Sequence, residues 1–98
     1  MPPALPEAAP EGVSRAVRFM LDADVAPGLL QRLLQPFAKR DLVPDRMWSH
    51  RLHDMLHVEI AMDAMPSEFV HLVEGNLRQV VGVHNVARVA ELGLRQAA

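Results

Sequence analysis

The sequence predicts an α+β fold of the ferredoxin-like type, in which two helices cover one face of a four-stranded antiparallel sheet. Three observations predict it: segments with alternating apolar residues, segments with helical apolar spacing, and the order in which the two kinds follow each other. That order is strand, helix, strand, strand, helix, strand, which is the split βαβ arrangement. Because the connections are short and the middle strands form a hairpin, few other topologies satisfy the connection rules.

The first two elements are predicted from apolar periodicity. Residues 14–22 should form a strand, because apolar side chains recur there with a period of two. A helix should follow from about residue 29, with an apolar face formed by Leu29, Leu30, Leu33, Leu34, Phe37 and Ala38. Pro36 lies inside this pattern, and since proline lacks an N–H it is expected to produce an irregularity over residues 32–35.

The second half of the chain supplies the remaining elements. A strand over residues 42–52 contains Pro44, which indicates an edge strand or a bulge. A turn at His53-Asp54 leads into residues 56–62, where the alternation is clearest. Pro66 is expected to open a helix that runs to about residue 80, and a last strand spans residues 83–89. The open sheet face is expected to carry Arg18, Trp48, His50, His57, Glu59 and Arg88.

Composition excludes several classes of function. The chain has 98 residues, enough for one domain, and its net charge of −2 offers no broad electrostatic footprint for nucleic acid. No apolar stretch is long enough to span a membrane, and the absence of cysteine excludes thiolate chemistry. These features are consistent with a cytoplasmic protein. We expect a mobile proline-rich tail over residues 1–13, a domain over 14–92 and a frayed end over 93–98.

The junction between the first strand and the first helix is the candidate binding site. An acidic loop over residues 22–26 leads into Pro27-Gly28, with proline expected at the first helical position. Gly28 has no Cβ, so a ligand can approach the backbone there, and the N–H groups of the first helical turn attract carboxylates. The segment therefore predicts a cradle for a small zwitterion, although it is also compatible with a plain strand-to-helix turn.

With the element order and this junction established, the chain resembles an ACT domain over about residues 14–92. The matching segments are Val17-Arg18-Phe19-Met20-Leu21, Pro27-Gly28-Leu29-Leu30, Phe37-Ala38-Lys39-Arg40-Asp41, the strand 55–62, the helix 68–80 and Gly82-Val83-His84-Asn85-Val86. Among ACT domains the chain is most similar to the short regulatory subunits of acetolactate synthase, which carry a PG-helix and an ending like Val80-Val81-Gly82-Val83-His84-Asn85-Val86.

The resemblance implies a non-catalytic regulatory module that binds an amino acid at the interface of a homodimer joined by edge strands. It implies a catalytic enzyme subunit as partner, in branched-chain amino acid biosynthesis, and no cofactor. The implied effector-binding residues are Asp22, Ala23, Asp24, Val25, Ala26, Pro27, Gly28, Leu29 and Val43. These subunits usually carry Asn at two positions where this chain has Val25 and either Val43 or Pro44.

Two hypotheses follow for the function of the chain, and the first is that it binds such an effector. Asp22 and Asp24 would pair with its ammonium group, and the N–H groups of Gly28 and Leu29 would bind its carboxylate, since an unpaired charge is costly to bury. The alternative from a different class is a structural dimerisation module without a ligand.

Enzymatic and metal-binding functions have less support. No serine lies in a G-x-S-x-G elbow, and Asp22 and Asp24 suit a helix N-terminus better than acid–base catalysis. His50, His53 and His57 cluster around the predicted hairpin, but the parity of a strand separates His50 from His53. A solvated turn is therefore favoured there over a metal site. His71 and His84 are expected to be isolated surface residues.

Overall fold

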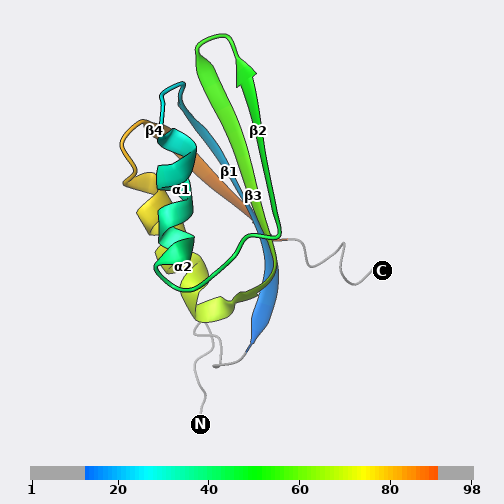
Figure 1. The fold of residues 1–98 in the computed structure, drawn as a ribbon. Coiled ribbons are helices and arrows are strands. Elements are labelled where there is room, and N and C mark those ends of the chain that lie inside the picture. The colour runs from blue at the N-terminus through cyan, green and yellow to red at the C-terminus, as the bar shows by residue number, and fades with distance from the viewer. Residues whose placement is uncertain (1–12, 91–98) are drawn as a thin grey trace.

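The computed structural model describes residues 13–90, and its elements follow the predicted order (Figure 1). They are β1 (Ser14–Asp24), α1 (Leu29–Ala38), β2 (Arg46–Leu52), β3 (Met55–Pro66), α2 (Ser67–Arg78) and β4 (Val83–Ala90). The predicted ferredoxin-like fold is confirmed. The predicted tail, apart from Val13, and the predicted frayed end lie outside the described residues.

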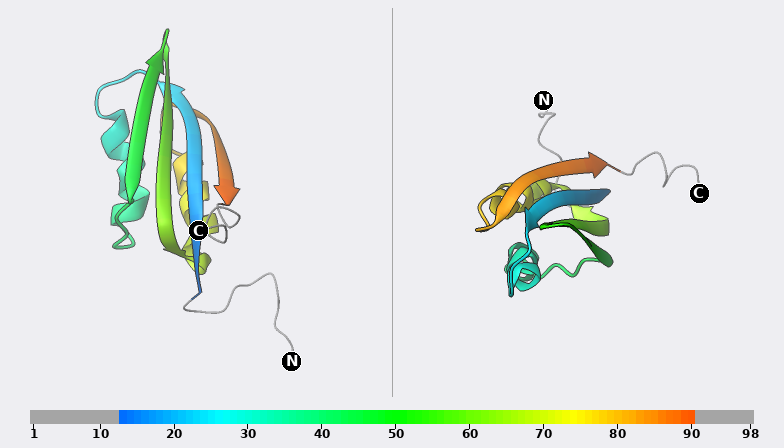
Figure 2. Two further views of the ribbon diagram at one scale, coloured as in Figure 1. Left: turned by 90° about the vertical axis from the view of Figure 1, so that its right-hand side faces the viewer. Right: turned by 90° about the horizontal axis from the view of Figure 1, so that it is seen from above.

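The strands form one four-stranded sheet in the order β2-β3-β1-β4, and every neighbouring pair is antiparallel. Both helices lie against the same face of this sheet, and the opposite face is left open (Figure 2). The long strands β1 and β3 are central, whereas β2 and β4 are the two edges. The hairpin turn lies at His53-Asp54, as predicted, with His53 at a φ of 59°.

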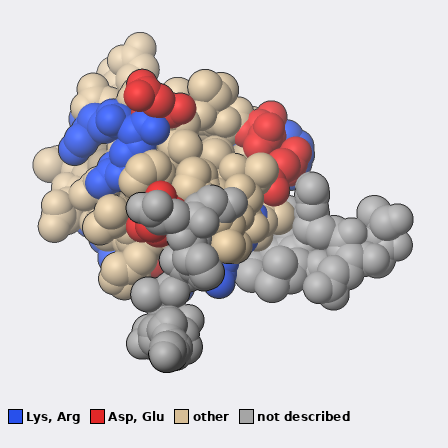
Figure 3. Space-filling view, turned by 90° about the horizontal axis from the view of Figure 1, so that it is seen from below, with Lys and Arg blue, Asp and Glu red and all other residues tan. Residues whose placement is uncertain are grey.

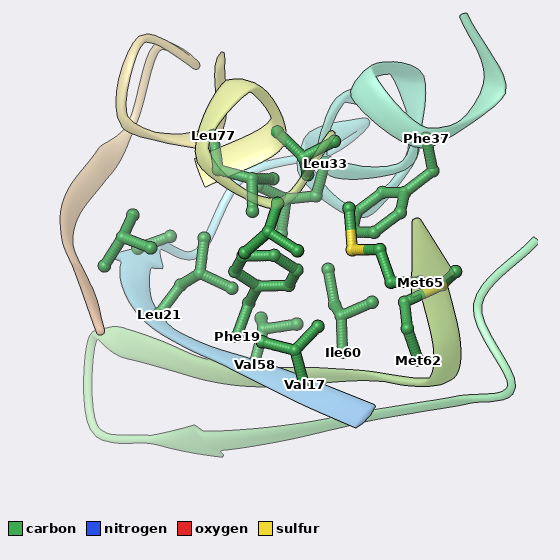
Figure 4. Close-up of a cluster of buried hydrophobic side chains, with 14 of the residues drawn as sticks. Val17, Phe19, Leu21, Leu33, Phe37, Val58, Ile60, Met62, Met65 and Leu77 are labelled. Atoms are coloured by element: carbon green, nitrogen blue, oxygen red, sulfur yellow. The ribbon is translucent and has the colours of Figure 1, made fainter. Parts of the chain in front are cut away.

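The core lies between the helices and the covered face of the sheet (Figure 4). Alternate residues of β1 and β3 point into it, and each helix contributes one apolar side, as the periodicities predict. Its fully buried members include Phe19, Leu21, Leu29, Leu33, Phe37, Val58, Ile60, Met65, Val73 and Leu77. The Phe19 and Phe37 rings meet edge to face, with centroids 5.9 Å apart, so α1 is fixed directly on the central strand.

Some element boundaries differ from the prediction. β2 begins at Arg46, so Pro44 lies in the loop before the strand and not inside it. α2 begins at Ser67, with Pro66 as the last residue of β3 and not the first of the helix. The predicted irregularity over residues 32–35 is also absent, because α1 continues unbroken past Pro36 to Ala38.

The end of α1 is a Schellman motif centred on Asp41. The Leu42 N–H donates to the Phe37 carbonyl at 2.9 Å, and the Asp41 N–H donates to the Ala38 carbonyl at 3.0 Å. Asp41 adopts a φ of 57°, a left-handed conformation that aspartate tolerates better than most residues. The chain then leaves the helix layer and crosses to the sheet edge at β2.

The open face of the sheet carries most of the polar residues that the alternation assigned to it. Arg88 is an exception: its register partner is the buried Phe19, and its Nε lies 3.3 Å from Glu74 Oε1 on α2, so it faces the helices. Trp48 lies on the edge strand β2 and is 51% exposed. Neither described helix has the length and apolar character needed to cross a membrane.

Candidate functional site

The segment that joins β1 to α1 is a type II turn. Pro27 and Gly28 are its central residues, and the Leu29 N–H donates to the Ala26 carbonyl at 3.2 Å. Gly28 has φ 81° and ψ −4°, which is the conformation that the third residue of this turn requires and that glycine adopts without steric cost. The helix therefore begins at Leu29 with Gly28 as its N-cap, and the expectation of Pro27 at the first helical position is wrong.

The turn decides which backbone amides remain available at the start of α1. The Leu29 N–H is engaged by Ala26, and the Arg32 N–H begins the helical ladder by donating to the Gly28 carbonyl at 3.1 Å. Within residues 13–90 the N–H groups of Gly28, Leu30 and Gln31 have no hydrogen-bond acceptor. The first turn of a helix carries partial positive charge, so these three amides are the ones available to an anion.

These three residues line an open hollow of about 560 Å³ at the start of α1. The lining residues are Val25, Ala26, Pro27, Gly28, Leu30, Gln31 and Leu56. Most of this wall is aliphatic, with the free amides as a polar patch, which is the usual composition of a small-molecule site. Leu56 belongs to β3 and pairs with Arg51 of β2, so the hollow lies beside the edge of the sheet that β2 forms.

The acidic residues of the loop do not line this hollow. Asp22 lies on the open sheet face, where its Oδ1 is 3.0 Å from His57 Nδ1. Asp24 Oδ1 is 2.6 Å from His84 Nε2, so His84 is not isolated as the sequence indicated. The structure thus gives both carboxylates histidine partners within the chain, outside the lining of the hollow.

Of the other predicted residues, Val25, Ala26, Pro27 and Gly28 come together around the hollow. Ala23 and Leu29 are fully buried in the core. Val43 is 81% exposed in the loop before β2 and is not part of the lining.

Sequence reasoning did not assign Leu30, Gln31 and Leu56 to the site. The apolar spacing places Leu30 with the core residues of α1, yet it follows the buried Leu29 by one position and is therefore turned about 100° away from it. The sequence alone could therefore have indicated that Leu30 lies outside the core. Leu56 offers no such signal, because only the packing of β3 against the turn brings it to the hollow.

A second polar group of residues lies on the open sheet face, around His57. Its Nδ1 is 3.0 Å from Asp22 Oδ1, and its Nε2 is 3.3 Å from Glu59 Oε2. The hydrogen bond to Asp22 raises the pKa of His57, against the opposing effect of burial, and the same bond lowers the pKa of Asp22. Charged His57 donates from both ring nitrogens and joins the two carboxylates. Arg18 Nη1 extends the group at 3.8 Å from Glu59 Oε1.

The histidines of the hairpin are arranged differently from a metal site. His50 and His57 are register partners across β2 and β3, whereas His53 lies in the turn. The Trp48 ring stacks on His50 with centroids 5.8 Å apart and meets His57 edge to face at 5.9 Å. Over residues 13–90, no group of three or more His, Cys, Asp or Glu side chains is arranged to hold a metal ion.

Comparisons with known proteins agree with this fold. A family model described as an ACT-like domain matches residues 12–93. The ACT domain from GTP pyrophosphokinase of Chlorobium tepidum aligns with a TM-score of 0.66 and 13% identity, over 79% of this chain and 100% of that one. An uncharacterized protein of Thermotoga maritima aligns with a TM-score of 0.64 and 11% identity, over 79% of this chain and 96% of that one.

A homoserine dehydrogenase of Thiobacillus denitrificans aligns with a TM-score of 0.71 and 20% identity, over 90% of this chain. The match spans only 19% of that enzyme's length. No curated protein matches the chain. At these identities the likeness concerns the fold, and the site rests on its own geometry.

Proposed function

The chain belongs to the ACT-like domain family, and we propose that it is a regulatory module that binds an amino acid in the hollow at the start of α1. The observation that carries this proposal is the coincidence of three free amides with an aliphatic wall. The N–H groups of Gly28, Leu30 and Gln31 would bind the effector carboxylate. The first turn of a helix carries partial positive charge, so its open N–H groups attract a carboxylate.

The proposed module is a homodimer that pairs along β2. This strand is a sheet edge whose residues are mostly exposed, and its backbone groups on the outer side are available to another strand. The hollow lies beside the same edge, because Leu56 is the register partner of Arg51. A second copy paired there would therefore cover the open side of the hollow and contribute backbone groups to the effector.

A branched-chain amino acid is the effector proposed here. Val25, Leu30 and Leu56 form an aliphatic wall that suits an aliphatic side chain. The sequence resemblance to regulatory subunits of acetolactate synthase supports the same choice, and it makes the catalytic subunit of that enzyme the proposed partner. Effector binding would act on the partner by favouring one of two arrangements of the dimer, since allostery requires different affinities for two states.

Thermal unfolding of the full chain, recorded with each of the twenty amino acids, tests this function. A ligand at about 100 times its dissociation constant stabilises a protein by roughly 2.7 kcal/mol. For a domain of this size each kcal/mol raises the melting temperature by about 4–8 °C. We expect valine, leucine or isoleucine to give the largest rise. A panel in which no amino acid moves the melting temperature would contradict the proposal and favour a dimerisation module without a ligand.

A charged substitution in the hollow locates the binding. Leu30→Glu places a carboxylate at the wall of the hollow, beside the free amides, and is expected to weaken binding by about tenfold or more through repulsion of the effector carboxylate. The added acid also suits the first turn of a helix, so the fold should be retained. Leu72→Glu is the matched control, since Leu72 is an exposed leucine on α2 outside the hollow. Equal loss in both variants would argue against this location.

A further inference from the structure

The helix layer contains a second hollow, which shares no lining residue with the proposed effector site. It is a groove of about 220 Å³ between α1 and α2, lined by Arg32, Gln35, Pro36, Lys39, Asn76, Gln79, Val80 and Val81. The α1 members follow the spacing i, i+3, i+4 and i+7, which places them in one stripe along the helix. Amphipathic helices usually bury an apolar stripe against their neighbour, whereas this stripe is mostly polar.

The charge of this groove is of one sign. Two cationic side chains line it, from Arg32 and Lys39, and no acidic residue does. Neither cation has a hydrogen-bond or ion-pair partner within residues 13–90. The other helix-facing cations are engaged: Arg40 donates to the Pro36 carbonyl, and Arg78 and Arg88 both contact Glu74.

Figure 3, which looks at the molecule from below, shows Lys and Arg side chains on the left, with Asp and Glu side chains beside them. The chain as a whole carries a net charge of −2, so a cationic groove is a local arrangement and not a consequence of composition. A groove of this charge favours an anion.

The remaining polar side chains of the lining are neutral. Gln35, Asn76 and Gln79 all contribute to it, and side-chain amides can donate hydrogen bonds through their NH₂ groups. The groove therefore suits an anion with oxygens for Arg32 and Lys39.

We propose that the groove between α1 and α2 binds a small phosphorylated anion. A phosphate dianion matches the two cations in charge, and arginine binds its oxygens through paired N–H groups while lysine acts as a point charge. Arg32 and Lys39 are seven positions apart, or about 10 Å along the helix axis, so a diphosphate group would reach both more fully than a single phosphate.

The first experiment measures which anions bind and where. The full chain, labelled with nitrogen-15, is titrated at constant ionic strength with inorganic phosphate, diphosphate, glycerol 3-phosphate and acetate. We expect shifts of the amide signals concentrated over residues 32–39 and 76–81, with diphosphate binding at least about tenfold tighter than acetate. Tighter binding of glycerol 3-phosphate than of inorganic phosphate would assign the site to phosphate esters. Equal, weak and dispersed shifts for all four anions would overturn the proposal.

The second experiment uses matched charge removals. In the double variant Arg32→Gln, Lys39→Gln the groove loses both cations, and we expect diphosphate affinity to fall by about tenfold or more. The control is the double variant Arg15→Gln, Arg51→Gln, which removes the same charge from exposed positions on β1 and β2 outside the groove. Circular dichroism establishes that both variants are folded. The same loss of affinity in the control would mean nonspecific attraction and would refute the site.

Discussion

The hollow at the start of α1 and the open sheet face differ in how their polar groups are paired. Around the hollow, the amides of Gly28, Leu30 and Gln31 have no acceptor among residues 13–90. On the sheet face, Asp22, His57 and Glu59 pair with one another. A strong cluster of charges is therefore not by itself a binding site. Groups that already pair stabilise the chain in a pH-dependent way, whereas groups left open are available to a ligand.

The largest effect on the unfolding free energy is expected from a substitution at Gly28, whose left-handed conformation forms the turn at the hollow. Gly28→Ala forces a left-handed φ on an L-residue, at a cost of roughly 1–2 kcal/mol of unfolding free energy. Its new Cβ would lie 3.3 Å from Arg32 Nη1, the flexible end of a long side chain that can move. Urea denaturation measures the loss, and the thermal shift with amino acids should fall at the same time.

Gly75 provides the matched control for this substitution. It lies within α2, and a Cβ there would meet nothing within 4 Å. Gly75→Ala is therefore expected to stabilise the protein by roughly 0.5–1 kcal/mol, because alanine loses less conformational entropy in a helix. If Gly28→Ala were as well tolerated as Gly75→Ala, the turn would not depend on glycine, and the contrast between the two regions would lose its basis.

A smaller, pH-dependent effect is expected on the sheet face. The pKa of His57 is raised in the folded state, so its stabilisation is present below the ordinary histidine value of 6.5 and is lost as pH rises through the folded pKa. The pKa of Asp22 is lowered, so its stabilisation is present above 3.8 and is lost as pH falls through the folded value. The pair therefore contributes most between these two ordinary values.

His57→Gln measures that contribution. We expect the difference in unfolding free energy between the natural chain and this variant to be larger at a pH of about 5.5 than at about 8.5, because Asp22 is ionised at both values while His57 gains its charge toward the lower one. The control is His71→Gln on the exposed side of α2, where no carboxylate among the described residues forms an ion pair or hydrogen bond with the histidine. A difference that changes with pH equally in both variants would contradict this role of His57.

The smallest effect is expected for the exposed ion pair between Arg46 and Asp63 on the β2–β3 hairpin. The Arg46 Nη2 and Asp63 Oδ1 atoms are 3.1 Å apart, but both side chains remain well exposed. Such pairs contribute about 0–1 kcal/mol and are screened by salt. Arg46→Gln should therefore lower the unfolding free energy by no more than that amount, and by less in 1 M sodium chloride, as urea denaturation would measure. A loss above about 2 kcal/mol would show that the exposure of an ion pair on this face does not indicate how much the pair stabilises the protein.

Local periodicity predicted the fold well, because each strand and helix of this chain buries one regular face. The same rule could have placed Arg88, which shares its parity with the buried Val86 and therefore faces the helices. The site was predicted less completely. The alternation of β1 continues to Asp24, so the strand extends two residues beyond the predicted 14–22 and includes both acidic residues of the predicted loop.

Contacts between distant segments account for the parts of the site that the sequence did not predict. Asp22 meets His57 and Asp24 meets His84, across 35 and 60 positions of sequence respectively. No local sequence pattern predicts such pairs, because they depend on the register between strands. The availability of the Gly28 amide and the engagement of the Leu29 amide likewise follow from the turn geometry, which the residues Pro27-Gly28 permit but do not dictate.

The position of Trp48 has a practical consequence. It is the sole tryptophan of the chain, half exposed on the edge strand β2 and in contact with the rings of His50 and His57. Its intrinsic fluorescence therefore comes from one known place on the surface. Emission recorded over a dilution series reports association of copies along that strand without any attached label, and a titration with acid follows the protonation of the neighbouring His57.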